Sequence, residues 1–109
     1  MRILMIGIVA AVSMLGMGST AGERPGARTH TITIEAMKYQ PESVTVAVGD
    51  RVVWVNKDVV AHTATSPKGG FDSKMIAPAE SWTLTVRTAG AFAYICTYHP
   101  TMKATLRVK

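Results

Sequence analysis

Short stretches of this chain alternate apolar and polar residues with a period of two. In residues 29–35, Ile32 and Ile34 fall on one side, and threonines and a glutamate fall on the other. Such alternation is typical of a strand with one buried face. The same pattern recurs along the chain and predicts strands at residues 29–35, 44–48, 51–56, 81–86, 91–96 and 103–109.

The strands are separated by turn residues, and residues 57–78 have no regular pattern. Gly49-Asp50 predicts a tight turn between two strands, and Ser66 to Gly70 is rich in turn formers. No helical period of useful length occurs in the pattern. Six or seven short strands with turns between them predict an all-β protein of the β-sandwich class, with one long loop in place of a short connection.

The first 21 residues do not fit this pattern. Arg2 precedes a largely apolar run at residues 3–15, and small residues follow as far as Ala21. This order is typical of a secretory signal peptide, and the run is shorter than the roughly 20 apolar residues that span a bilayer. We therefore expect residues 1–21 to be a cleaved signal peptide, residues 22–28 a flexible leader and residues 29–109 the folded domain.

Charge limits the kinds of partner that the domain can have. Arg2 is the only charged residue of the first 21, so the remaining chain keeps eleven of the twelve basic residues and all seven acidic ones. A net charge of that sign favours acidic protein partners. The basic residues are scattered singly without interleaved aromatic residues, which does not favour nucleic-acid binding.

The only cysteine of the chain lies in the segment Cys-Thr-Tyr-His-Pro-Thr-Met, which ends at Met102. Cys96, His99 and Met102 provide a thiolate, an imidazole and a thioether within seven residues. Sulfur donors select Cu(I), and one Cys with two His and a weak axial Met is the ligand set of a blue-copper centre. The alternatives are an inert buried cysteine and a zinc site, although zinc does not favour methionine.

A second histidine must come from elsewhere in the chain. His30 lies within the first predicted strand, whereas His62 follows a strongly apolar strand at the start of the long loop. A loop residue at the end of a rigid strand is the better candidate ligand, since binding residues concentrate on such loops. The expected metal ligands are therefore His62, Cys96, His99 and Met102.

These residues resemble the small blue copper proteins, the cupredoxins. The resemblance rests on Val48-Gly49-Asp50, Trp54 to Asp58, His62-Thr63 and the Cys96 to Met102 loop, and it covers roughly residues 31–109. The C-x-x-H-x-x-M spacing resembles the amicyanins within that family. The resemblance implies a cupredoxin-like Greek-key β-sandwich of about seven or eight strands with one copper ion per chain.

The resemblance also implies roles for individual residues. His62, Cys96 and His99 would be the strong equatorial ligands and Met102 the long axial one, while Thr63 and Thr97 would join the two ligand loops around them. Electrons would enter or leave through His99. Tyr98 departs from the family pattern, which has proline before this histidine.

The function implied is that of a periplasmic, monomeric one-electron carrier without enzymatic activity. The resemblance to amicyanin implies two redox partners that would dock near His99. The electron donor would be a dehydrogenase for amines, and the acceptor would be a c-type cytochrome. The alternative is a periplasmic copper storage or delivery protein. Four protein ligands on one metal leave no open position for a substrate, which does not favour an enzyme.

Overall fold

The computed structural model describes residues 26–109, so the predicted signal peptide and most of the predicted leader lie outside the described residues. The described chain contains seven strands: β1 (Thr29–Glu35), β2 (Lys38–Gln40), β3 (Ser43–Val46), β4 (Arg51–Asn56), β5 (Ser81–Thr85), β6 (Gly90–Ile95) and β7 (Lys103–Val108). Within this range no helix could cross a membrane.

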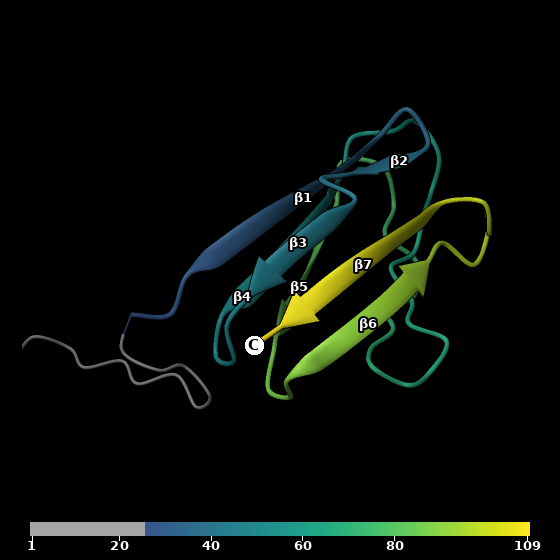
Figure 1. Cartoon of the computed structure of the whole chain (residues 1–109). Coiled ribbons are helices and arrows are strands. Elements are labelled where there is room, and N and C mark those ends of the chain that lie inside the picture. Colours follow the sequence, from purple (N-terminus) through teal and green to yellow (C-terminus); the bar gives the residue numbers. More distant parts are fainter. Residues whose placement is uncertain (1–25) are drawn as a thin grey trace, which may run out of the picture.

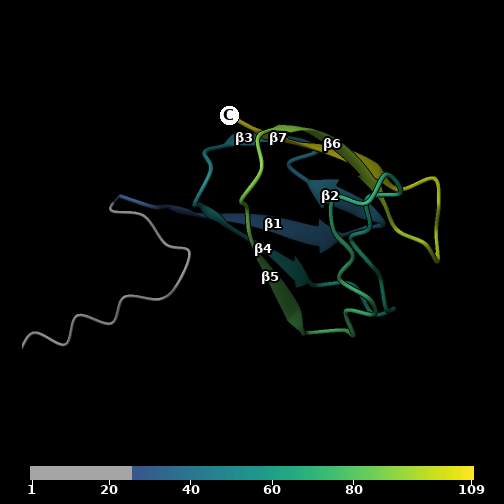
Figure 2. The same cartoon turned by 90° about the horizontal axis from the view of Figure 1, so that it is seen from below.

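The strands form two sheets that face each other (Figures 1 and 2). One has the order β2-β1-β4-β5 and the other β3-β7-β6. The pairs β1/β4 and β3/β7 are parallel and the other pairs are antiparallel. A parallel pair requires a crossover connection, so the chain passes repeatedly between the sheets. The predicted β-sandwich is confirmed.

The sequence pattern predicted most strand bounds closely but not all of them. Strands β1 and β4 have the predicted bounds, whereas β3 ends at Val46, two residues earlier than predicted. Strand β2 was not predicted, because three residues are too few to show alternation. It pairs with β1 from Thr33↔Gln40 to Glu35↔Lys38 after a turn at Ala36 and Met37.

Aromatic rings fill the space between the sheets. Trp54 lies opposite Ile32 on one side and Trp82 on the other. The rings of Trp54 and Tyr94 meet edge to face, with centroids 5.6 Å apart and an interplanar angle of 90°. Tyr39 contacts Tyr94 at 4.7 Å. This packing, in which Trp54 is fully buried, fixes the ends of β4 and β6 relative to each other.

The long loop between β4 and β5 is held against the sandwich by hydrogen bonds. Thr65 and Ile95 exchange two backbone bonds of 2.8 and 2.9 Å, and His62 and Ile76 exchange two more. The buried Asn56 side chain donates to the carbonyl groups of Val60 and Ile76. The loop therefore brings its first residues beside the end of β6.

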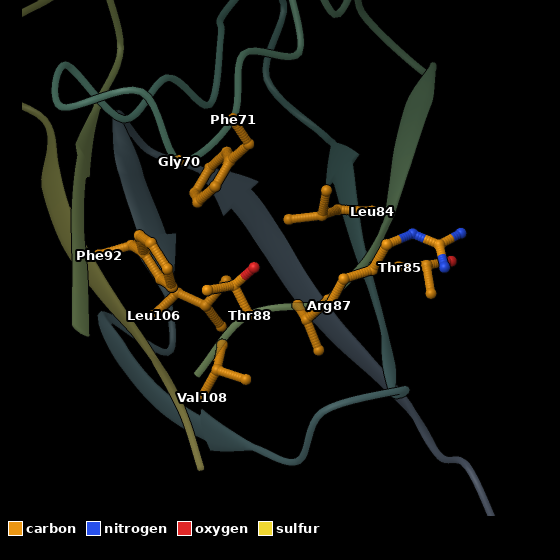
Figure 3. A pocket seen from close by; sticks show the side chains of 10 residues that line it. Gly70, Phe71, Leu84, Thr85, Arg87, Thr88, Phe92, Leu106 and Val108 are labelled. Carbon is orange, nitrogen blue, oxygen red and sulfur yellow. The ribbon is translucent and has the colours of Figure 1, made fainter. Parts of the chain in front are cut away.

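A cavity of about 270 Å³ lies between the open edges of the two sheets, among β5, β6, β7 and the long loop. Figure 3 shows the side chains that line it. Its lining is mainly apolar and includes Phe71, Leu84 and Phe92. Gly70 is required beside it, because a Cβ there would lie 2.7 Å from the Phe92 ring. None of the predicted metal ligands lines this cavity.

Candidate metal centre

Three of the predicted ligands come together at one end of the sandwich. The ligand atoms of His62, Cys96 and His99 all lie within 4.8 Å of one another. Cys96 Sγ is 3.7 Å from His62 Nδ1 and 3.6 Å from His99 Nδ1. Typical metal bonds of about 2.3 Å to sulfur and about 2.0 Å to nitrogen imply S···N separations of about 3.5–3.7 Å. The arrangement therefore fits one shared metal ion.

Two loops supply the ligands. His62 follows β4 and is paired with Ile76, while Cys96 directly follows the last residue of β6. The ligand loop from Cys96 to Met102 is closed by backbone bonds: Cys96 N–H donates to Met102 O (3.2 Å), His99 N–H to Cys96 O (3.2 Å) and Met102 N–H to His99 O (2.9 Å). This tight closure holds the three predicted ligands of the loop at one site.

The site is closed to solvent except at one residue. His62 and Cys96 are fully buried and Met102 is 4% exposed, whereas His99 is partly exposed. A buried thiol, imidazole and thioether at one place form a soft donor set. The donors fit copper and, because of the methionine, fit zinc less well.

Thr63 joins the two ligand loops, as the resemblance implied. Its backbone N–H donates to Cys96 Sγ at 3.4 Å. Its Oγ1 accepts the Thr97 N–H at 2.9 Å and lies 3.2 Å from Thr97 Oγ1. Tyr39 donates its buried hydroxyl to the Thr63 carbonyl. Thr63 is thus held from both sides, which limits the movement of the sulfur relative to His62.

Asp58 lies next to the site, although the sequence predicted for it only a position in the long loop. Its Oδ2 lies 2.7 Å from His62 Nε2, and its carboxylate accepts the N–H groups of Ala36 and Met37. Burial opposes ionisation of Asp58, but the bonds from Met37, His62 and Ala36 outweigh it and hold the pKa of the carboxyl below its usual range. The four-residue spacing to His62 was the available signal.

His30 lies outside this group. It is in β1, and its Nε2 is 2.9 Å from Asp50 Oδ2. Asp50 is buried and also accepts the N–H groups of Arg28 and Ala47. The structure therefore places His62, the histidine chosen from the sequence, beside Cys96 and His99. His30 lies in a separate polar contact with Asp50.

Exposed apolar residues occur on the two ligand loops and on the segment paired with the first of them. Val59 is 92% exposed, Met75 61% and Tyr98 50%. Val59 lies three residues before His62, Met75 precedes the partner of His62, and Tyr98 precedes His99. Apolar and aromatic side chains of this kind are frequent at protein interfaces.

A two-sheet sandwich with one buried cysteine, two histidines and a methionine on the loops at one end is typical of the blue copper proteins. The chain belongs to the cupredoxin-like domain family, whose model matches residues 7–108.

Individual relatives agree with this placement. Amicyanin of Paracoccus versutus is 29% identical over 122 residues, covering 93% of this chain and 92% of the relative. The crystal structure of amicyanin from that organism has a TM-score of 0.70 and 32% identity, covering 74% of this chain and 81% of that chain. A copper-containing nitrite reductase from Thermus scotoductus has a TM-score of 0.70 and 26% identity, but the match covers only 22% of it. The chain is therefore similar to amicyanin over nearly the whole length of both proteins and to only about a fifth of the nitrite reductase.

Proposed function

We propose that this protein is a periplasmic one-electron carrier with a mononuclear type 1 copper centre. His62, Cys96, His99 and Met102 would hold the copper ion. The observation that carries the proposal is the convergence of one sulfur and two histidine nitrogens within 4.8 Å, with the buried Met102 closing the loop that carries two of these ligands. No other grouping of three His, Cys, Asp or Glu at metal-binding distance occurs among residues 26–109.

A copper ion at this site supplies reversible one-electron chemistry between Cu(I) and Cu(II). The protein's part is to keep the same donor positions in both oxidation states. The Thr63 N–H stabilises negative charge on Cys96 Sγ, and the Thr63–Thr97 contacts resist separation of the two loops. Full burial of His62 and Cys96 excludes water from their side chains. Four protein donors leave no position for a substrate, so we propose no enzymatic activity.

His99 is the proposed point of electron entry and exit. It is the ligand with a partly exposed side chain, whereas the other three are at most 4% exposed. Tyr98 beside it is half exposed, and Val59 and Met75, on the first ligand loop and on the segment paired with it, are exposed as well. A partner that docks over Tyr98 and His99 would bring its redox group close to the His99 ring edge.

We further propose that residues 1–21 are removed on export and that residues 22–28 form a leader before the domain at residues 29–109. This proposal rests on the signal-like order of residues 1–21. The proposed partners are a dehydrogenase as electron donor, by likeness to amicyanin an amine dehydrogenase, and a c-type cytochrome as acceptor. The protein would meet them as a monomer, and its basic charge would favour acidic docking surfaces.

The test separates a carrier from a copper delivery protein. The copper-loaded protein is reduced with ascorbate, reoxidised with ferricyanide and cycled repeatedly, in the presence and absence of a strong Cu(I) chelator. A carrier returns to its full Cu(II) absorbance after each cycle and retains its copper beside the chelator. Rapid transfer of Cu(I) to the chelator on the first reduction would favour delivery and contradict the carrier.

A further inference from the structure

Charged residues are divided unevenly between the two ends of the sandwich. The metal centre lies at one end, the metal end, beside the last residues of β4 and β6. At the opposite end β1 and β4 begin and β5 and β7 finish. The arginines of the described chain all lie at this opposite end: Arg28 before β1, Arg51 at the start of β4, Arg87 after β5 and Arg107 near the end of β7. Lys109 follows β7, and we call these five residues the basic end.

Few acidic groups oppose this charge. Asp50 lies at the basic end but is only 3% exposed, and its carboxylate accepts the N–H groups of Arg28 and Ala47 and contacts His30. The other acidic residues of the described chain lie at the metal end: Glu35, Glu42, Asp58, Asp72 and Glu80. Four arginines and one lysine against Asp50 and a terminal carboxylate give the basic end a net charge of +3.

The metal end has no such excess. Its basic residues are Lys38, Lys57, Lys74 and Lys103, and four lysines against five carboxylates give it a net charge of −1. The ends also differ in the kind of cation. The planar guanidinium of arginine binds a phosphate or carboxylate through two parallel hydrogen bonds, whereas the lysine ammonium acts as a point charge. Arg28, Arg87 and Arg107 are exposed and Arg51 is partly exposed, so the basic end offers these groups to an anionic surface.

Exposed apolar residues distinguish the two ends as well. Those at the metal end are Met37, Val59, Val60, Met75 and Tyr98, whereas Val48, 38% exposed, is the one large apolar residue exposed at the basic end within the described range. Protein interfaces depend on a few buried aromatic and apolar anchors, which the basic end lacks. An anionic lipid surface requires no such anchors, because it attracts basic residues by charge.

The chain enters the domain at the basic end. Strand β1 begins there, at the same end at which β7 finishes (Figure 1). The leader, residues 22–28, therefore joins the proposed signal peptide to this end. Seven residues span at most about 25 Å when fully extended. While the apolar run of the signal is in the membrane during export, the basic end is thus the part of the domain held closest to the lipid headgroups.

We propose that the basic end is a docking surface for an anionic phospholipid bilayer. Its guanidinium groups pair with headgroup phosphates, and the domain stands on the membrane with the metal centre and His99 turned away from the lipid. The His99 surface then stays open to redox partners in the aqueous phase. The proposal rests on the proposed function for export and for the role of His99, whereas binding to lipid can be measured without copper.

Sedimentation with vesicles is the first test. The protein from Gly22 onward is used, because the apolar run of residues 3–15 would itself enter a bilayer. The protein is expected to sediment with vesicles of phosphatidylcholine mixed with phosphatidylglycerol and not with phosphatidylcholine alone. Rising ionic strength should weaken the binding. Absence of binding to the phosphatidylglycerol vesicles at low ionic strength would overturn the proposal.

Two matched double variants separate the ends of the domain. R87Q/R107Q should lower the partition onto phosphatidylglycerol vesicles by about 25-fold, since each basic residue near an anionic surface contributes about fivefold. K38Q/K57Q removes the same charge from the metal end and should bind nearly as the wild type does. All four side chains are exposed, so both variants should fold. An equal loss of binding in the two variants would show that net charge alone drives it and would contradict the proposal.

The orientation and the chemistry of the contact are tested separately. Vesicles that carry a gadolinium-chelating lipid should broaden the amide NMR signals of residues 47–51 and 87–90 and leave those of residues 96–102 sharp. Broadening of residues 96–102 instead would contradict the proposed orientation. Displacement from the vesicles by polyglutamate more readily than by polyphosphate would assign the basic end to an acidic protein and overturn the proposal. A protein that binds the vesicles as expected but takes up no copper would overturn the proposed function alone.

Discussion

Two buried tyrosines allow one hydrogen bond to be tested against a matched control. Tyr39 and Tyr94 are each 1% exposed, and their rings lie in contact with centroids 4.7 Å apart. Tyr39 donates its hydroxyl to the Thr63 carbonyl, whereas the Tyr94 hydroxyl makes only a weak polar contact with the Trp54 side chain and no regular hydrogen bond within the described part of the chain. The same substitution, Tyr to Phe, therefore removes a hydrogen bond at Tyr39 but only a buried hydroxyl without a regular hydrogen bond at Tyr94.

The expected magnitudes differ for a physical reason. Tyr39→Phe leaves the carbonyl of Thr63, a residue 2% exposed, without that donor, and an unsatisfied buried acceptor costs about 1–3 kcal/mol. Tyr94→Phe removes a buried hydroxyl that makes no regular hydrogen bond. Its effect on the free energy of unfolding should be close to zero or stabilising by up to about 1 kcal/mol.

Urea unfolding of the metal-free proteins measures both changes under one condition. With the slope against denaturant unchanged, a lower midpoint for Tyr39→Phe reports the lost stability directly. We expect Tyr39→Phe to be the less stable variant by at least about 1 kcal/mol. Equal stabilities, or a less stable Tyr94→Phe, would refute the assignment of the Tyr39–Thr63 bond.

Four further outcomes are expected. Burial raises the pKa of both Tyr39 and Tyr94, so on raising the pH these hydroxyls ionise in the unfolded state before they do in the folded state. The free energy of unfolding should therefore be constant below about pH 10 and should decrease above it by about 1.4 kcal/mol per pH unit for each tyrosine. Unfolding measured between pH 9 and 11 checks this. Ala36→Gly should raise the free energy of unfolding in urea by up to about 1 kcal/mol by relieving a positive φ, whereas Ala91→Gly, in an exposed strand position, should lower it by about 0.5–1 kcal/mol. Thr63→Val removes the acceptor of the Thr97 N–H and should cost about 1–3 kcal/mol of stability, with a shifted copper absorption spectrum as the second readout. Copper removal should lower the melting temperature in calorimetry, because the native site binds the ion and the unfolded chain does not.

The sequence predicted what depends on local pattern. Alternation located β1 and β4 to the residue, because each has one face on the core, and the donor spacing from Cys96 to Met102 indicated the ligand loop. His62 could be chosen over His30 because a strand end and a following loop are visible in the sequence. The structure then brought His62 and Cys96 together, 34 residues apart in the chain.

Other features depend on contacts between distant segments and could not be predicted. Strand β2 is only three residues long and exists through its pairing with β1. The bond from Tyr39 to Thr63 spans 24 residues, and no local pattern indicates it. Asp58 is a partial exception: its spacing from His62 could have suggested the contact, but its two bonds to the Ala36–Met37 turn could not have been inferred.

Titration of the purified metal-free protein with Cu(II), followed by visible absorption and metal analysis, is the decisive experiment for the copper centre. We expect an intense visible band that saturates at one copper per chain, disappears in Cys96→Ser and His62→Gln, and persists in His30→Gln. One equivalent of bound copper without the intense band, or a band that persists in Cys96→Ser, would contradict a copper centre built on Cys96 and His62.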